Sequence, residues 1–305
     1  MKRLILLGAS SMTLWSCTEK SPNIIMTAAA DKTDTTYVIS TLPLAQPHNI
    51  LVENFTGTTC SNCPSAHDIL HTLETSNPGR LNIMSLYIKN FAQTEPPKMP
   101  GSPVDAKYDF RSDIATDILK SVYTSIAAMP TAGMDRLPIG SAATYGSEYL
   151  IGRDSWASVV ATQTNVKDSI NVDVVSTYTS SDSMAHITVT LTYMYNMNTM
   201  QSLSIAVVED GFIDIQENAE APTGWDTAYH FDNILRGMVT AGSLGDAVLP
   251  AMASKEKGRV YKATYNYKVN AAWKPENCRV IAFVHRSAAE RGTLIYQSQQ
   301  AKLKP

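Results

Sequence analysis

The residues best suited to chemistry in this sequence are two cysteines in the run Cys60-Ser61-Asn62-Cys63-Pro64. A turn containing Gly57 precedes them and a helical pattern follows, so Cys60 is expected at or just before the first helical turn. Unpaired N–H groups and the helix dipole favour a thiolate over a thiol at that position. Cys60 is therefore the expected nucleophile, and the two-residue spacer lets Cys63 resolve a mixed disulfide.

A metal site is the alternative chemistry for this pair. C-x-x-C is also half of a zinc site, but the sequence has no second C-x-x-C to complete one. His67 and His71 follow Cys63 at four-residue steps on one helical face, an arrangement that could bind zinc or copper. The plainer interpretation is two partly exposed histidines on an amphipathic helix, with His67 placed to tune the thiol.

The elements expected around the pair have the order of a βαβ unit. Residues 49–55 and 83–88 have the composition of strands, and apolar residues recur at helical spacing from 60 to 74. A proline-rich loop follows, then a helical pattern over 104–123 and a short strand over 132–137. This order requires a parallel strand pair with helices packed on the sheet.

A proline is also placed to face the cysteines, in the run Met129-Pro130-Thr131 after the second expected helix. With the C-x-x-C motif and the βαβ order, it makes this half of the chain resemble the thioredoxin superfamily, in which a cis proline abuts the disulfide. The resemblance implies catalytic roles for Cys60, Cys63 and Pro130. A loop proline in trans is the alternative for Pro130.

One position departs from that superfamily. Many thioredoxin-like enzymes carry a buried acid six residues before the first cysteine, where it can relay a proton, and here that residue is Asn54. Glu53 is adjacent but is expected to point to the opposite face of the strand. This departure argues against fast dithiol exchange and leaves slow or specialised exchange open.

Beyond about residue 164 the apolar period changes from helical to two. Strands are predicted at 187–193, 203–208, 261–269, 279–284 and 294–297. Several antiparallel strands with little helix predict an immunoglobulin-like β-sandwich as a second domain. The stretch 217–237 is expected to be irregular and long enough to carry something other than packing.

The first residues have the order of an export signal. Lys2 and Arg3 precede an apolar stretch over 4–14 that is too short to span a bilayer permanently. The run Leu14-Trp15-Ser16-Cys17 resembles the lipobox of bacterial lipoproteins, which implies an acyl lipid such as palmitate on Cys17 after cleavage. A buried N-terminal helix that happens to end in a cysteine is the alternative.

The expected organisation of the chain has four parts. They are a signal peptide (1–16), a lipidated N-terminus and linker (17–44), a thioredoxin-like domain (45–164) and a β-sandwich domain (165–305). A mature chain of this length is long for one core, so two domains are expected.

Charge and the remaining cysteine limit the partners. Removing 1–16 takes away two positive charges and moves the net charge from -3 to -5, which argues against nucleic acid. No basic patch for anionic headgroups appears, so the lipid is the expected membrane anchor.

In an oxidising compartment Cys60 and Cys63 can pair. Cys278 is then expected to be a buried, inert thiol, with a resolving or metal-binding role as the alternative. No cofactor is expected beyond the redox disulfide.

Four segments together resemble one family. They are the lipobox, the run 51–67 with its C-x-x-C-P-x-A-H motif, the Met129-Pro130-Thr131 turn with Asp135-Arg136, and the run 229–236. The family is the Bacteroides-group lipoprotein family named after a twenty-eight-kilodalton outer-membrane protein. The resemblance covers nearly the whole mature chain and implies a thioredoxin-like domain followed by a β-rich domain, at the periplasmic face of the outer membrane or at the cell surface. It gives no substrate and no role for the run 229–236.

Three functions remain open. The first is thiol-disulfide exchange with exported protein partners that the sequence does not identify. The second is surface binding or adhesion by a lipoprotein in which the Cys60–Cys63 disulfide is structural. The third is metal handling by Cys60, Cys63 and His67. No Ser-His-Asp order, phosphate-cradling glycine loop or carboxylate pair supports a hydrolase or a kinase.

Overall fold

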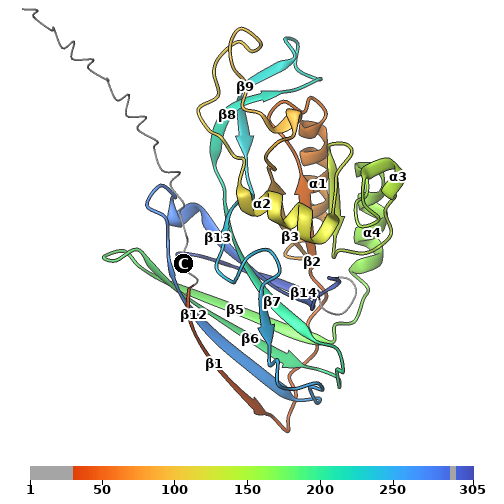
Figure 1. Ribbon diagram of the computed structural model, residues 1–305, viewed down its shortest axis with the longest axis vertical. Coiled ribbons are helices and arrows are strands. Elements are labelled where there is room, and N and C mark those ends of the chain that lie inside the picture. The colour runs from red at the N-terminus through yellow and green to blue at the C-terminus, as the bar shows by residue number, and fades with distance from the viewer. Residues whose placement is uncertain (1–29, 289–292) are drawn as a thin grey trace, which may run out of the picture.

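The computed structural model describes residues 30–288 and 293–305 (Figure 1). The expected export signal and Cys17 lie outside the described residues. Within the described part, strands dominate and the helices are few and short. No helix in these residues is long and apolar enough to cross a bilayer.

The first half of the chain has the predicted alternation of strands and helices. Its elements are β2 (Ile50–Phe55), α1 (Cys63–Ser76), β3 (Leu81–Leu86), α2 (Asp113–Ile118), β4 (Thr131–Met134), α3 (Ala142–Tyr145) and α4 (Trp156–Gln163). Strands β2 and β3 are parallel and joined by α1, while β4 pairs antiparallel with β2. The predicted parallel pair is confirmed.

Helices cover both faces of this part of the sheet. Alternation along β2 sends Ile50 and Val52 into an apolar cluster with side chains of α1 and α4. Leu51 and Phe55 point the other way, into a second cluster that contains residues of α2. A parallel pair needs this cover because both of its faces are apolar.

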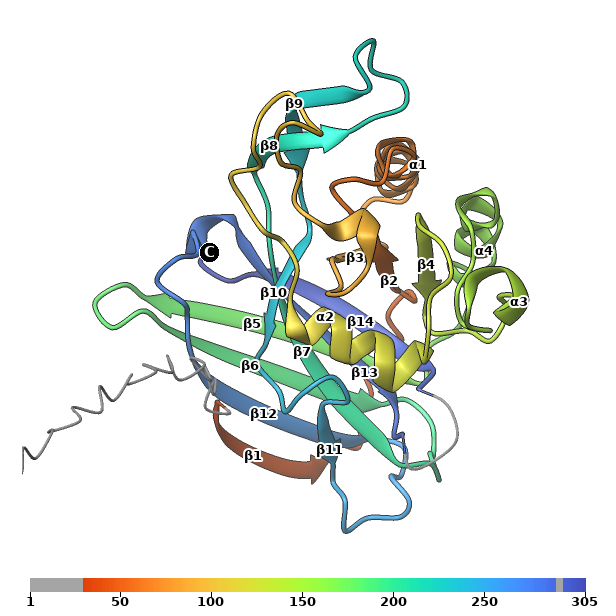
Figure 2. The same cartoon turned by 45° about the horizontal axis from the view of Figure 1, so that its top comes forward.

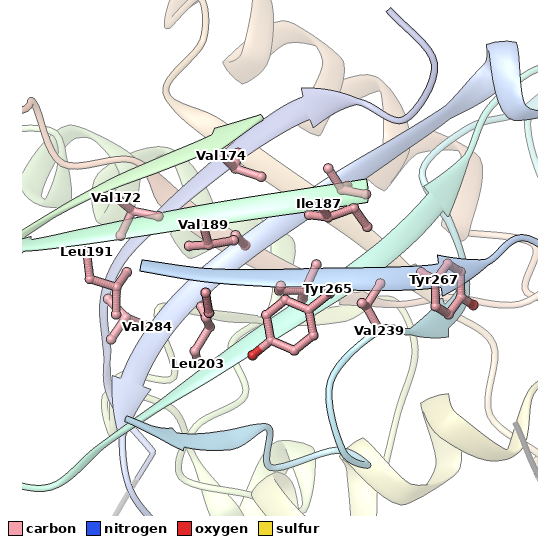
Figure 3. Close-up of a cluster of buried hydrophobic side chains, with 14 of the residues drawn as sticks. Val172, Val174, Ile187, Val189, Leu191, Leu203, Val239, Tyr265, Tyr267 and Val284 are labelled. Atoms are coloured by element: carbon pink, nitrogen blue, oxygen red, sulfur yellow. The ribbon is translucent and has the colours of Figure 1, made fainter. Parts of the chain in front are cut away.

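The second half is built from antiparallel strands, together with one strand from the N-terminus. Its elements are β1 (Asp31–Val38), β5 (Ile170–Thr179), β6 (Met184–Tyr193), β7 (Gln201–Glu209), β8 (Phe212–Glu217), β9 (Trp225–Phe231), β10 (Ile234–Met238), β11 (Asp246–Val248), β12 (Arg259–Lys268), β13 (Cys278–Arg286) and β14 (Ile295–Lys302). One sheet has the order β1-β12-β6-β5. It faces β7 and β13, and Figure 3 shows the apolar side chains buried between them, among them Val189, Leu191, Leu203 and Val284.

A second sheet passes through both halves of the chain, in the order β14-β13-β7-β10-β3-β2-β4 (Figure 2). Strand β10 is antiparallel to β7 and parallel to β3, with Ile234 opposite Ser85. The backbone N–H of Ser85 donates to the carbonyl of Asn233 at 2.7 Å. The two predicted domains therefore share a sheet, and a boundary near residue 164 stays a prediction.

Two segments expected to be irregular are strands. Part of the predicted linker 17–44 forms β1, which pairs antiparallel with β12 along its whole length, with Asp31 opposite Asn266. Its threonine-rich sequence favours an extended strand. Within the stretch 217–237, β9 pairs with β8 in a hairpin and β10 enters the large sheet. The pairings of β1 with β12 and of β10 with β3 join residues far apart in the sequence, so the local pattern did not predict them.

The helix predicted over 104–123 is shorter than expected. It begins at Asp113, where the Ser112 hydroxyl caps it by accepting the N–H of Ala115 at 3.1 Å, and it ends in one π-helical turn. The preceding residues are held outside the helix because the Asp214 carboxylate accepts the backbone N–H of Lys107 at 2.9 Å. An acid on β8 thus overrides the local helical pattern.

A buried ionic network connects the start of β2 to the start of β5. The His48 ring lies 2.8 Å from the Asp135 carboxylate through Nε2 and 2.6 Å from the Asp168 carboxylate through Nδ1. Burial alone would lower the pKa of His48, but hydrogen bonds to both carboxylates and their charges raise it to about 10. Burial also raises the pKa of Asp135 and of Asp168, against the opposing effect of His48. The folded protein therefore holds more protons here than the unfolded chain.

We expect the free energy of unfolding to fall as the pH rises towards about 10. Unfolded His48 loses its proton near its ordinary pKa of 6.5, whereas folded His48 keeps it up to about pH 10, so its stabilising contribution disappears across that window. His48→Gln removes the titration and should make the decline shallower. Urea unfolding of the wild type and His48→Gln across that pH range measures the change in the free energy of unfolding. His186→Gln, at an exposed position of β6, is the control. Equal pH dependence in the wild type and His48→Gln would contradict the assignment.

Candidate functional site

Cys60 and Cys63 form a disulfide where the chain enters α1. The helix begins at Cys63, and the N–H of Cys63 donates to the carbonyl of Cys60 at 3.0 Å. Cys60 therefore lies just before the helix, as the helical pattern predicts. Pro64 occupies the first turn, where a missing N–H costs nothing.

The Met129–Pro130 peptide bond is cis and leads directly into β4. Because β2 and β4 run antiparallel with Phe55 opposite Thr131, Pro130 lies at the end of the sheet from which the chain continues to Cys60. Met129 belongs to the same buried cluster as both cysteines. The structure thus brings Cys60, Cys63 and Pro130 to one edge of the sheet, and their catalytic roles stay a prediction.

Both cysteines are covered by protein. Cys60 is 1% exposed and Cys63 is 0% exposed. A short turn that includes Gln93 lies against the loop on one side, where the Gln93 carbonyl accepts the N–H of Thr59 at 3.0 Å. A Cβ at Gly57 would lie 2.0 Å from the same carbonyl, so this close approach requires glycine.

The other side is covered by residues 216–219, here named the strap, where the chain leaves β8. Three of its groups donate to the cysteine loop: Glu217 N to Thr58 O at 2.9 Å, Ala219 N to Ser61 O at 2.9 Å, and Gln216 Nε2 to Cys60 O at 3.2 Å. The strap comes from the second half of the chain. A partner thiol can therefore reach the disulfide only after one of the two covers moves.

Glu53 and Asn54 point to opposite faces of β2, as alternation predicts. The buried Glu53 carboxylate accepts two hydrogen bonds of 2.8 Å from the Arg136 guanidinium and one of 2.5 Å from the Tyr123 hydroxyl. Burial alone would lower the pKa of Arg136, but the Glu53 charge raises it above its ordinary value. The guanidinium also lies 5.3 Å from the centre of the Phe283 ring. Both Glu53 oxygens are thus committed to a structural pair.

Asn54 points towards α1 and is 0% exposed. Neither atom of its side-chain amide has a hydrogen-bond partner among the described residues. The protein therefore places an uncharged, unpaired amide six residues before the first cysteine of the pair. An amide cannot take up the proton that a buried acid at this position would relay.

The two histidines of α1 have different surroundings. His67 Nε2 lies 3.0 Å from the Thr56 hydroxyl and Nδ1 lies 2.7 Å from the Tyr229 hydroxyl on β9. Burial lowers the pKa of His67 to about 4, so its ring is neutral near pH 7. His71 is exposed. Within the part of the chain that the structure describes, no group of three or more His, Cys, Asp or Glu side chains is arranged to hold a metal ion.

Cys278 lies on β13 and is 1% exposed, as expected for a buried thiol. Burial raises its pKa to about 12, with a smaller contribution from the charge of Glu209. The thiolate is therefore scarce at neutral pH, which agrees with an inert side chain.

Sequence reasoning missed the Glu53–Arg136 pair, the strap and the His67–Tyr229 contact. The sequence did contain a signal for the Glu53–Arg136 pair, because the acid Glu53 inside the largely apolar run 50–55 needs a buried cation. The strap and Tyr229 lie in or beside the stretch predicted to be irregular. No local pattern links them to the cysteine loop.

Comparison with known proteins gives one family and a shared fold. A family model described as outer membrane protein Omp28 matches residues 117–305. The solved structure of HBP35 of Porphyromonas gingivalis is similar to this chain with a TM-score of 0.61 at 15% identity, over 85% of this chain and 77% of that chain. Protein AGR_C_4864 from Agrobacterium tumefaciens matches with a TM-score of 0.49 at 10% identity, over 85% of this chain and 97% of that chain. The search of curated proteins found no match.

We expect Arg136→Met to lower the free energy of unfolding by about 3 to 5 kcal/mol, because it leaves the Glu53 carboxylate buried without its cation. Replacing both residues by methionine should recover much of that loss, since an apolar pair of similar volume is often tolerated. Arg111→Met, which breaks partly exposed ion pairs with Asp109 and Glu95, is the control and should cost less, about 1 kcal/mol.

Urea denaturation of the four proteins measures these differences. A loss in Arg136→Met no larger than that in Arg111→Met would show that the Arg136 guanidinium does not stabilise the buried Glu53 carboxylate. A double variant less stable than Arg136→Met alone would show that packing around the guanidinium matters more than its charge.

Proposed function

Since the chain belongs to the Omp28 outer membrane protein family, we propose that it is an outer-membrane lipoprotein whose Cys60–Cys63 pair exchanges disulfides with exported proteins. The family supports the outer membrane as the location. The lipid on Cys17 and the redox activity are parts of the proposal. The observation that carries it is the disulfide at the start of α1, on the same sheet edge as Pro130.

The proposed architecture is a thioredoxin-like domain over 45–164 and an immunoglobulin-like β-sandwich over 165–305. The parallel pair β2–β3 joined by α1, the antiparallel β4 and the helices on both faces support the first part. The two facing sheets with a shared apolar core support the second. The first domain is completed by β10, which the second domain supplies.

The proposed reaction is a two-step exchange. A thiolate of a partner dithiol attacks Sγ of Cys60, the Cys60–Cys63 bond breaks, and Cys63 leaves as a thiolate that takes up a proton. The second partner thiolate then attacks the partner sulfur of the mixed disulfide and releases Cys60. Two electrons pass from the partner dithiol to the cysteine pair, and the reverse sequence oxidises the pair and reduces the partner.

The cover over the cysteines makes this exchange conditional. Because both side chains are buried, the strap or the Gln93 turn must move before a thiolate can approach. The absence of an acid at Asn54 also leaves proton uptake to water or to the partner. Both features support slow, selective exchange over rapid general reduction.

The second candidate is a surface-binding lipoprotein in which the disulfide is a structural link. The burial of both cysteines is the observation that favours it, since structural disulfides are shielded from attacking thiolates. Metal handling by Cys60, Cys63 and His67 gains no support from the geometry, because the two sulfurs are bonded to each other and both ring nitrogens of His67 have partners.

We expect Cys63→Ser to accumulate mixed disulfides with exported proteins, because Cys60 can attack but nothing resolves the product. Cys60→Ser should accumulate none. Non-reducing electrophoresis of envelope proteins measures both, and the wild-type pair should have a reduction potential between those of thioredoxin and the periplasmic oxidants. No trapped protein, together with a potential below about -300 mV, would instead support the structural disulfide.

The strap supplies a matched pair of variants for the same test. Ala219→Pro removes the N–H that donates to Ser61, whereas Ala219→Ser keeps it. Loss of one hydrogen bond worth about 1 kcal/mol should make opening about fivefold easier, and reduction by glutathione about fivefold faster, in the proline variant only. Equal rates in the two variants would show that the strap does not control access.

We expect Cys17→Ala to leave an unprocessed or soluble protein, because the lipid supplies nearly all the membrane affinity of an acidic chain. Fractionation after a high-salt wash, with Cys278→Ala as the control, measures it. Retention of Cys17→Ala in the washed membranes would contradict the lipid anchor.

A further inference from the structure

A cavity of about 710 Å³ lies between α1, the strands β2 and β3, and the strand β9 with the turn that follows it. Asn54, Ile83 and Ser85 form its floor, and His67 and Tyr229 contribute to its wall. The volume is in the range of sites that hold small ligands or peptide segments. Its wall includes part of the run 229–236, for which the sequence gives no role.

The floor of the cavity carries an unsatisfied polar group. Asn54 is 0% exposed, and both its amide oxygen and its amide nitrogen lack partners within the described part of the chain. Glu53 points to the opposite side of β2, so Asn54 points into the cavity. Buried polar groups are almost always hydrogen-bonded, and one that is not requires an explanation. An amide offers an acceptor beside a donor, which matches the N–H and C=O of a peptide backbone.

The rim of the cavity is acidic. The carboxylates of Asp68, Glu74, Asp226 and Asp232 lie around it, and none of the four forms an ion pair with a described residue. The guanidinium of Arg279 also lies there, but it is bound to Asp210 at 3.0 Å, so these two charges offset each other. His67 is neutral because burial lowers its pKa to about 4. The four unpaired carboxylates therefore make the rim favour a cation.

We propose that this cavity binds a basic segment of a polypeptide. A backbone amide of the segment pairs with Asn54 at the floor, and its Lys or Arg side chains lie against the four carboxylates. A free polyamine could use the rim but would leave the amide N–H of Asn54 without an acceptor. Peptide binding of this kind needs no sulfur chemistry, so it does not depend on the proposed disulfide exchange.

The test uses the full chain and short fluorescent peptides without cysteine. A peptide of alternating Lys and Gly should bind with an affinity that falls as salt rises, and a Glu–Gly peptide of equal length should not bind. Asn54→Leu, which keeps the size of the side chain, should weaken the Lys–Gly peptide about thirtyfold, the loss expected for two hydrogen bonds. Fluorescence anisotropy measures each affinity.

Two further variants test the rim. Asp226→Asn with Asp232→Asn should lower both the affinity and its salt dependence. Asp117→Asn, an exposed residue of α2 on the opposite face of the sheet, is the matched control and should change neither. Equal binding of the two peptides, or unchanged binding by the rim double variant, would overturn the proposal. Spermidine that competes fully with the peptide while Asn54→Leu binds like the wild type would identify a polyamine site instead.

Discussion

Strand β10 hydrogen-bonds β3 on one side and β7 on the other, and the arrangement of the site depends on this double pairing. It fixes the chain that precedes β10, so the hairpin β8–β9 lies beside α1 (Figure 2) and contacts the cysteine loop. Tyr229 then reaches His67, and the strap reaches the loop of Cys60. Without β10, the edge of β3 would be open and the disulfide would lose one of its two covers.

Consecutive residues of β2 show two solutions to the burial of a polar side chain. The Glu53 charge is compensated by the Arg136 guanidinium, which donates one hydrogen bond to each carboxylate oxygen. The guanidinium also lies over the Phe283 ring. Asn54 carries no charge, and its unpaired amide costs less than an unpaired carboxylate would. A substitution of acid for amide at Asn54 would add a charge to a site that already has four carboxylates at its rim. The local electrostatics thus favour an amide over a carboxylate at this position.

The sequence predicted those elements whose pattern is determined by their own residues. Strand β6 and strand β12 alternate because one face of each lies against a core, and α1 repeats its apolar residues because one face packs on the sheet. Strand β1 was not predicted because its partner β12 is far away in the sequence, and the hairpin β8–β9 was not predicted because burial does not alternate along its two strands. For the site, the helical pattern predicted that Cys60 lies just before α1, as the structure has it. It did not indicate the burial of the two cysteines, because the strap is distant in the sequence and two of its three donors to the cysteine loop are backbone N–H groups.

The hairpin β8–β9 borders both the disulfide and the cavity. The strap follows β8 and Tyr229 lies on β9, so a movement that lifts the hairpin from α1 would uncover the cysteines and remove one wall of the cavity together. A basic segment bound between α1 and Tyr229 would favour the closed hairpin by its binding free energy. By reciprocity, opening of the strap would weaken binding by the same factor. A basic segment in the cavity would therefore disfavour access to the disulfide on the strap side, whereas access on the side of the Gln93 turn would not require the hairpin to lift.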